Sequence, residues 1–292
     1  MSALTRELEF SLDLARRCGV IAVDIQRGGA ASLDAREKDD DQGLVTRADM
    51  ELNRRIVSAL SEAFPADAII AEETAELIQS GNIHRDTRRC WYIDPVDGTK
   101  EFASGDDTWA IHIGLCIDGR PVLGVVHEPA QRRLNWGVLD PDTGASIAAR
   151  FQVGDGPAQA LAPTSRGLDA LRLVSSKSHS SPRTLEVMAT LGIDPADNLR
   201  VGSVGVKVSA IARAAAEVYA HPKSGTKLWD SCAPQAVLTA AGGAMTDVTG
   251  RPLDYRGASL VNTRGLLATH GSHHAEIVER LAPLTSKWFP GA

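Results

Sequence analysis

The sequence predicts two halves of different fold class, an α+β half followed by an α/β half. In the first half, apolar segments at residues 109–117, 121–127 and 134–139 follow one another through short turns, which is typical of an antiparallel sheet. In the second half, short apolar strands alternate with helical segments. Residues 140–168 are rich in Pro, Gly, Asp and Ala, so we expect the boundary between two domains within this segment.

Two amphipathic helices are expected ahead of the first sheet. Residues 5–26 carry apolar side chains at steps of three and four, and a second helix would follow Thr46 and stop at Pro65. Thr46 and Asp49 stand three apart at its start, as a capping box requires, so Asp49 has a structural explanation as well as a chemical one. Residues 28–43 are expected to form a mobile loop between the two helices.

Acidic residues follow two short apolar strands. Residues 68–71 form the first strand, and two glutamates come directly after it. Residues 91–93 form the second, and the turn that begins at Asp94 and Pro95 delivers Asp94 and Asp97 within four residues. Because binding sites are built where strands end in loops, these carboxylates are candidate ligands.

The alternation along residues 109–117 predicts a half-buried strand. Large apolar side chains alternate there with the smaller Ala110, His112, Gly114 and Cys116. We interpret His112, on the smaller face, as a structural residue. Asp118 and Gly119, directly afterwards, are a hairpin turn signal.

The second half is expected to hold five strands and four helices. The strands are predicted at residues 171–175, 199–203, 218–221, 245–248 and 266–269. The first helix would follow Ser181 and Pro182, with Leu185, Met188 and Leu191 pointing inward. Ser203 would cap the second helix, which carries Lys207; Asp230 would begin an Ala-rich third helix; Ile277 and Leu281 would lie on the last.

Composition and charge exclude several classes of protein. The formal net charge of −6 argues against a surface for nucleic acid or anionic membrane. The chain has no run of eighteen apolar residues, so no transmembrane segment is expected. Its acidic N-terminal residues are unlike a signal peptide. The four cysteines lack zinc-type spacing, and we expect reduced thiols in a cytoplasmic protein.

Six acidic side chains are candidates for the chemistry. Their positions are Asp49, Glu72, Glu73, Asp94, Asp97 and Asp230. Clustered carboxylates repel one another unless a cation is present, and the absence of His and Cys from these motifs favours Mg²⁺ over zinc. Asp230 alone could equally be a helix cap.

A phosphate site is expected beside these carboxylates. The turn at Gly98 and Thr99 offers backbone N–H groups to a phosphate. Two or three Mg²⁺ ions held by Glu72, Asp94, Asp97 and Asp230 would then indicate metal-assisted hydrolysis of a phosphoester. Asp49, hydrogen bonded to Thr99, would take a proton from the attacking water.

The sequence also resembles a known family. The motifs that carry the resemblance are Asp94-Pro95-Val96-Asp97-Gly98-Thr99, Trp229-Asp230-Ser231-Cys232-Ala233-Pro234, Glu72-Glu73 and Val45-Thr46-Arg47-Ala48-Asp49. They resemble the signatures of the inositol monophosphatase superfamily of Mg²⁺-dependent, lithium-sensitive phosphatases. Within it, further segments resemble the 3′(2′),5′-bisphosphate nucleotidases, namely Lys100-Glu101-Phe102, Ser176-Lys177-Ser178-His179, Gly202-Ser203-Val204-Gly205-Val206-Lys207 and Gly225-Thr226-Lys227-Leu228-Trp229-Asp230.

The resemblance implies a five-layer αβαβα sandwich of the sugar-phosphatase type and a set of site residues. Metal ligands would be Glu72, Asp94, the Val96 carbonyl, Asp97 and Asp230, and the water-activating pair would be Asp49 and Thr99. The substrate would meet Glu72, Asp97, Gly98, Thr99, Lys100, Ser176, His179, Ser203, Lys207 and Asp230. A first domain at residues 1–160 would hold most metal ligands, and a second at residues 161–292 the nucleotide loops and Asp230.

The activity implied is removal of the 3′-phosphate from adenosine 3′,5′-bisphosphate, giving AMP and phosphate. Mn²⁺ would substitute for Mg²⁺, Li⁺ would inhibit, and a homodimer is the assembly usual among such relatives. Inositol monophosphate, fructose 1,6-bisphosphate and histidinol phosphate remain alternative substrates. Another alternative is a catalytically silent protein that binds metal or phosphate as a regulator, and Lys207 could equally be a solvated helix residue.

Overall fold

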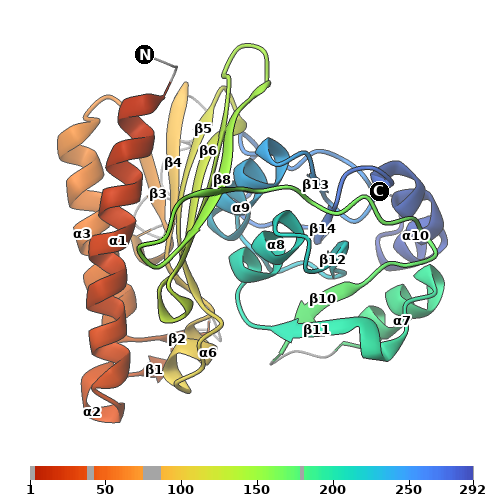
Figure 1. Cartoon of the computed structure of the whole chain (residues 1–292), viewed down its shortest axis with the longest axis horizontal. Helices are drawn as coiled ribbons and strands as arrows, with labels where there is room; N and C mark the ends of the chain where they lie inside the picture. The colour runs from red at the N-terminus through yellow and green to blue at the C-terminus, as the bar shows by residue number, and fades with distance from the viewer. Residues whose placement is uncertain (1–3, 38–42, 75–86, 178–180, 292) are drawn as a thin grey trace.

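Five layers of secondary structure follow one another across the molecule (Figure 1). The computed structural model describes residues 4–37, 43–74, 87–177 and 181–291. Two helices cover the outer face of a seven-stranded sheet, and two more lie between it and a five-stranded sheet. A last pair of helices covers the far face of the second sheet. The αβαβα sandwich expected from the sequence is therefore confirmed.

The outer layer consists of α1 (Thr5–Arg27) and α3 (Arg47–Ala63). Both helices bury their apolar faces against the first sheet, as their periodicity predicted. Between them lie a helical turn, α2 (Ala30–Leu33), and two short antiparallel strands, β1 (Arg36–Glu37) and β2 (Leu44–Val45). The prediction of a loop over residues 28–43 is therefore wrong for the described residues, because strand pairing orders part of it; residues 38–42 lie outside them.

The first sheet has the strand order β3-β4-β5-β6-β7-β8-β9. Its strands are β3 (Ala68–Ala71), β4 (Arg89–Asp97), β5 (Ala110–Ile117), β6 (Arg120–Glu128), β7 (Arg133–Leu139), β8 (Ser146–Val153) and β9 (Gln159–Ala160). The predicted antiparallel arrangement holds from β4 onward, but β3 pairs parallel with β4. One expectation was wrong, because β5 is buried along its whole length rather than on one face. A further strand, at residues 146–153, was not predicted.

The strand β5 is buried on both faces because α9 (Leu228–Ala240) lies directly on the sheet. Gly114, Gly124 and Gly137 stand side by side on β5, β6 and β7. A Cβ atom on Gly124 would lie 2.1 Å from the carbonyl oxygen of Ala233, and one on Gly114 would lie 2.7 Å from the amide nitrogen of Ala233. This row of glycines sets the depth of α9, which carries Asp230.

The second sheet has the order β11-β10-β12-β14-β13. Its strands are β10 (Leu173–Ser176), β11 (Asn198–Val201), β12 (Val218–His221), β13 (Ala244–Thr246) and β14 (Leu266–Thr269). β10 is parallel to β11 and β12, whereas β14 runs antiparallel to β12 and β13. The helices α8 (Val204–Ala212) and α9 cover one face, and α7 (Pro182–Leu191) and α10 (His274–Trp288) the other.

The inward face of α7 differs from the prediction. Met188 and Leu191 are buried as expected, but Leu185 is 65% exposed. Val187 completes the inward face in its place, because it lies on the same side of the helix as Leu191.

Among the helices of the described segments, none is both long and apolar enough to cross a membrane.

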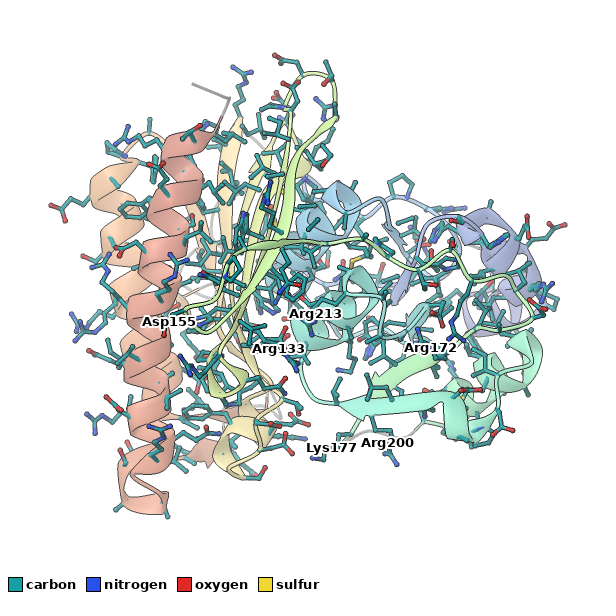
Figure 2. The ribbon with its side chains drawn as sticks, viewed as in Figure 1. Arg133, Asp155, Arg172, Lys177, Arg200 and Arg213 are labelled. Carbon is teal, nitrogen blue, oxygen red and sulfur yellow. The ribbon has the colours of Figure 1, made fainter. Side chains whose placement is uncertain are left out.

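A buried ion pair ties the two halves together. Arg213, at the C-terminal end of α8, donates to Glu128 Oε1 on β6 and to Asn135 Oδ1 on β7, each at 2.6 Å. Glu128 is fully buried. Figure 2 shows Arg213 beside α8 on the side that faces the first sheet. Because a buried carboxylate needs its partner, this contact holds α8 in a defined position on the sheet.

Candidate active site

A cavity of about 710 Å³ is lined by residues of both halves. Nine of the residues predicted from the sequence line it: Glu72, Asp97, Gly98, Thr99, Lys100, Ser176, Ser203, Lys207 and Asp230. Asp49, Asp94 and Val96 are buried residues beside this cavity, in contact with its lining. His179 lies outside the described residues.

The end of β4 brings the central motif into the cavity. The strand continues through Asp94 to Asp97, where the sequence suggested a turn, and its pairing with β5 is interrupted between these two residues. The Val96 amide donates to Asp94 Oδ1 at 3.0 Å. Gly98 then adopts a left-handed conformation, with φ of 92°, and begins the short helix α6 (Thr99–Ala103). The bulge turns both carboxylates toward the second half.

Asp94 and Asp230 lie within a cluster of like charges. Burial raises the pKa of Asp94 well above its ordinary value, and the carboxylates of Glu72, Asp97 and Asp230 add to the effect. Burial likewise raises the pKa of Asp230, and the carboxylates of Asp97 and Glu72 add to the effect. Buried carboxyl groups that repel one another retain protons unless a cation compensates their charge.

The position of Asp230 differs from a simple helix cap. Lys227 occupies the N-cap of α9, and Asp230, three residues later, accepts from the Lys227 amide at 2.8 Å. One oxygen of Asp230 is thereby bound to the protein, and the side chain lines the cavity. The helix end therefore orients a carboxylate toward Asp94.

The donors in this cluster are carboxylate and carbonyl oxygens, which suit a hard cation such as Mg²⁺. Across the described segments, no three His, Cys, Asp or Glu side chains already stand in a metal-binding arrangement. The cluster nevertheless combines buried like charges with raised pKa values at Asp94 and Asp230. The chemistry of the residues therefore fits Mg²⁺, which would take the place of the retained protons.

Asp97 is bound from the opposite side by α8 and β5. Its Oδ2 accepts from the Ser203 hydroxyl at 2.5 Å and from the Gly205 amide at 2.9 Å, and His112 Nε2 lies 3.1 Å away. Burial alone would raise the pKa of Asp97, but His112, Lys207 and the Ser203 hydroxyl hold it below its ordinary value. These contacts favour the ionised form of Asp97.

Asp49 and Thr99 are in hydrogen-bond contact. The Thr99 hydroxyl lies 3.2 Å from Asp49 Oδ1 and 3.0 Å from the Val96 carbonyl oxygen. Asp49 Oδ2 accepts from the amide and the hydroxyl of Thr46, at 2.8 and 2.5 Å, in the predicted capping box. Burial raises the pKa of Asp49 to about 7, with Glu72 and Glu73 adding to the effect and Thr46 opposing it. A carboxyl group with this pKa can exchange protons near neutrality.

Lys207 is buried beneath the cavity rather than solvated on its helix. It is 4% exposed, and its ammonium donates to the Ser203 carbonyl oxygen at 2.7 Å and lies 5.4 Å from the centre of the Tyr219 ring. Burial lowers the pKa of Lys207 to about 8, although Asp97, Glu101 and Asp230 oppose the shift. The ammonium places a positive charge next to the acidic cluster.

The rim of the cavity comes from both halves. Lys177, which follows β10, forms an ion pair with Asp106 of the loop after α6. Arg200 on β11 donates to the carbonyl oxygens of Ser176 and Lys177, at 3.5 and 3.0 Å. Figure 2 shows Lys177 and Arg200 next to each other at the same end of the second sheet. Ser176 thus lies next to a contact between the two halves, the ion pair of Lys177 and Asp106.

Sequence reasoning missed two buried polar residues of the site. His112 contacts Asp97, and Glu101 lines the cavity with a carboxylate that is 7% exposed. Glu101 could have been predicted from the sequence, because it directly follows the Gly-Thr-Lys segment. For His112 the sequence held no usable signal, because its contact depends on the pairing of β5 with β4.

Comparison with known proteins agrees with this geometry. The model of the inositol monophosphatase family matches residues 4–285. The rat protein named 3′(2′),5′-bisphosphate nucleotidase 1 is 29% identical, covering 91% of each chain. Inositol monophosphatase 3 of Xenopus tropicalis is also 29% identical, over 82% of this chain and 69% of its own.

A solved structure shows the same fold. The inositol monophosphatase of Thermotoga maritima superposes with a TM-score of 0.76 at 22% identity, over 97% of this chain and all of its own. The family match covers nearly the whole sequence, including every carboxylate of the cluster and α9. The chain therefore belongs to the inositol monophosphatase family, whose members are Mg²⁺-dependent phosphatases.

Proposed function

We propose that the protein is a Mg²⁺-dependent phosphomonoesterase that removes the 3′-phosphate of adenosine 3′,5′-bisphosphate, giving AMP and phosphate. The observation that carries the proposal is the cavity between the halves, where an acidic cluster, a glycine turn and a buried ammonium lie together. The name of the rat relative supports the nucleotide as substrate.

The acidic cluster would bind the metal. In this proposal Glu72, Asp94, Asp97, Asp230 and the Val96 carbonyl oxygen hold two or three Mg²⁺ ions. Bound Mg²⁺ would supply the positive charge that stabilises the phosphoryl oxygens during hydrolysis. The amides of the turn from Asp97 to Thr99 would hold the scissile phosphate, for which the left-handed Gly98 leaves space.

Asp49 and Thr99 would activate water. The 3.2 Å contact between Thr99 Oγ1 and Asp49 Oδ1 supports a route along which the hydroxyl takes the proton of the attacking water and passes its own to the carboxylate. Because Asp49 Oδ2 is occupied by Thr46, Oδ1 is the oxygen left to accept this proton.

Binding of the nucleotide would use Lys100, Ser176, His179, Ser203 and Lys207. A buried ammonium such as Lys207 supports recognition of a second phosphate, because its charge is poorly screened. The Ser203 hydroxyl donates its proton to Asp97, so toward the nucleotide it would act as an acceptor. The side chain of Ser203 would therefore contribute less than Lys207.

The test is phosphate release with Mg²⁺ from adenosine 3′,5′-bisphosphate, inositol 1-phosphate and fructose 1,6-bisphosphate. We expect kcat/KM to favour the nucleotide by at least about 100-fold. Lys207→Met should lower the nucleotide value at least about tenfold more than the inositol phosphate value, whereas Lys287→Met, on the outer helix α10, should change neither. Equal rates on all three substrates would contradict the proposed substrate.

Inositol monophosphate is the second candidate substrate, because the relative named inositol monophosphatase 3 has the same 29% identity as the rat nucleotidase, although over less of each chain. In that case inositol 1-phosphate would be the preferred substrate and Lys207→Met would affect both substrates alike. Failure of every substrate would instead favour a silent regulator that binds metal or phosphate.

We further propose that Mn²⁺ substitutes for Mg²⁺, that Li⁺ inhibits, and that the protein is a cytoplasmic homodimer of two-domain chains that divide near residue 160. Free, buried thiols at all four cysteines suit a reducing compartment. Sedimentation velocity would test the dimer, and phosphate release with added Li⁺ would test inhibition.

A further inference from the structure

A fully buried histidine contacts the acidic cluster from a strand to which the sequence assigned no role in the site. His112 is 0% exposed and lies in the middle of β5, directly opposite Asp94 of β4. Its neighbours Ile111 and Ile113 belong to the core beneath α1 and α3, so alternation along the strand directs His112 to the opposite face, toward α8. It therefore lies between the first sheet and the second half.

The ring is held between Asp97 and α8. Nε2 lies 3.1 Å from Asp97 Oδ2, off the axis of an ideal hydrogen bond, and Nδ1 has no partner among the described residues. A Cβ atom on Gly205 would lie 2.0 Å from His112 Nε2. The first turn of α8 can therefore approach the imidazole only because residue 205 is glycine.

His112 completes the set of contacts on one oxygen of Asp97. With the Ser203 hydroxyl and the Gly205 amide, three groups from β5 and α8 surround Oδ2. Over the described residues, no group donates to Oδ1, and Asp97 lines the cavity. Partners of this kind fix the orientation of a metal-binding carboxylate and tune its affinity.

We propose that His112 is a positioning residue that holds Asp97 Oδ2 against α8 and so presents Oδ1 to a divalent cation. This inference rests on the proposed function only in assuming that Asp97 binds the cation. It adds a residue whose contact links cation binding to the docking of α8, and hence of the second half, on the first sheet.

The test is calorimetric titration with Mg²⁺ alone, without substrate. His112→Leu keeps an apolar group of similar size but removes the contact with Asp97, so we expect its Kd for Mg²⁺ to rise about 10- to 100-fold. His112→Gln, which retains a donor, should stay within about threefold of the unmodified protein.

The chain offers a closely matched control in His127 on the neighbouring strand β6. His127 is also buried and packs on a glycine of a covering helix, since a Cβ on Gly19 would lie 2.3 Å from its Cε1, but its Nδ1 contacts the Ala15 carbonyl oxygen instead of a carboxylate. His127→Leu should leave the Kd unchanged. If His112→Leu does not fold, Gly205→Ala should weaken Mg²⁺ binding through displacement of the ring, and Gly19→Ala should not.

Two results would overturn the inference. One is unchanged Mg²⁺ affinity in folded His112→Leu, or in folded Gly205→Ala where that variant is used. The other is an equal loss in His127→Leu, which would indicate a general packing effect. If the unmodified protein bound no Mg²⁺, the proposed function itself would fail, whereas failure of the inference alone would leave its Mg²⁺ binding and phosphatase activity intact.

Discussion

At the scale of single residues, four of the site carboxylates share a pattern in which amides or hydroxyls of the protein bind one oxygen. Asp49 Oδ2 is bound by Thr46, Asp97 Oδ2 by Ser203 and Gly205, and Asp230 Oδ2 by the amide of Lys227, whereas Asp94 uses Oδ1 for the amide of Val96. The donors on Asp49, Asp94 and Asp230 lie within three residues of the carboxylate, whereas those on Asp97 come from α8. The second oxygen stays available for chemistry, and that of Asp49 contacts the Thr99 hydroxyl.

Asp94→Asn should separate stability from activity. The amide keeps an acceptor for the Val96 amide but removes a charge from a cluster whose mutual repulsion raises the pKa of Asp94. We expect the metal-free variant near pH 8 to be more stable by about 1 kcal/mol, or roughly 2 °C in Tm, while kcat/KM falls at least about 100-fold. Thermal melts in chelator and phosphate release would measure both.

Asp247→Asn is the contrasting control. Asp247 is also buried, but it is paired with Arg264 at 2.6 Å and accepts from the amides of Thr249 and Arg251. Removing its charge should lower Tm, because the buried carboxylate is replaced by an amide and the guanidinium of Arg264 loses its charged partner. A lower Tm in both variants would show that Asp94 is stabilising and would contradict the view of a repulsive cluster.

At the scale of elements, helix ends place the chemistry. The start of α3 holds Asp49, the start of α8 binds Asp97, and the start of α9 orients Asp230. Each uses unpaired amides that every helix N-terminus exposes. The same bonds that begin the helix therefore orient the carboxylate.

Thr46→Val tests this dual use at α3. The variant loses the cap on the Ala48 amide and the hydroxyl that binds Asp49. We expect a loss of about 1 kcal/mol in stability and a fall in kcat of about tenfold or more, with KM little changed because Thr46 does not line the cavity. Thr46→Ser should restore kcat.

Asp194→Ala gives the matched comparison for a lost cap. Asp194 caps the short 3₁₀ helix at Pro195–Asp197 and is exposed, away from the cavity. The Asp194→Ala variant should have a lower free energy of unfolding and an unchanged kcat. If kcat in Thr46→Val fell no further than in Asp194→Ala, Thr46 would have a structural role alone.

The glycine row beneath α9 makes a second prediction for an element. Gly124→Ala would place Cβ 2.1 Å from the Ala233 carbonyl oxygen, which belongs to the helix backbone and cannot rotate away. We expect about 1–3 kcal/mol of destabilisation, and lower activity even where the protein is folded, because α9 moves with Asp230. Urea unfolding and phosphate release would measure these effects.

Gly167→Ala is the control for that substitution, since the close neighbour of its Cβ is the Asp169 side chain, at 2.8 Å. A side chain can move, so the variant should match the unmodified protein. If Gly124→Ala lost stability but kept full activity, the depth of α9 would not control the site.

Particular elements show which features of the fold could be predicted from the sequence. The capping box at Thr46 and Asp49 was predictable because it is a local pattern with local geometry. The burial of both faces of β5 was not, because Ala110, Gly114 and Cys116 resemble an exposed small face until α9 is known to cover it. The strand β8 was not predicted, because it forms through pairing with β7 and its sequence lacks a clear alternation of apolar residues.

The site shows the same division between local and long-range information. Motifs identified the acidic residues, and they converge because their segments are strand and helix ends. The contact of His112 with Asp97 needed the register of β5 on β4 and the docking of α8 from the other half. Neither is encoded in nearby residues.

At the scale of the whole molecule, the cavity is assembled from two halves that are held together by the middle layer of helices, α8 and α9. Glu72 and Asp97 come from the first half, and Lys207 and Asp230 from helices of the second that pack on the first sheet. The buried pair of Arg213 and Glu128 fixes the same interface. Cation binding should therefore stabilise the complete fold rather than one half, in a manner linked to pH.

In the metal-free protein, protons neutralise part of the acidic cluster. The pKa of Asp49 is raised to about 7, and those of Asp94 and Asp230 are raised well above 3.8. Between about pH 4 and 7 the folded protein thus keeps protons that the unfolded chain releases. Because the unfolded state binds fewer protons there, these groups lower the free energy of unfolding as pH rises, by about 1.4 kcal/mol per pH unit for each proton.

Mg²⁺ should therefore stabilise the protein more at pH 8 than at pH 5, because at low pH it must displace the bound protons. We expect the rise in Tm on adding saturating Mg²⁺ to grow across this range and to nearly vanish in Asp94→Asn. The lowered pKa values of His127 and His274 make the free energy of unfolding rise with pH below about pH 6.5. Both residues lie outside the cavity, so we expect their contributions to be the same with and without Mg²⁺ and to cancel in the difference between the two Tm values. Calorimetric melts with chelator and with Mg²⁺ would measure it, and an equal rise at both pH values would show that protons and Mg²⁺ do not compete for these carboxylates.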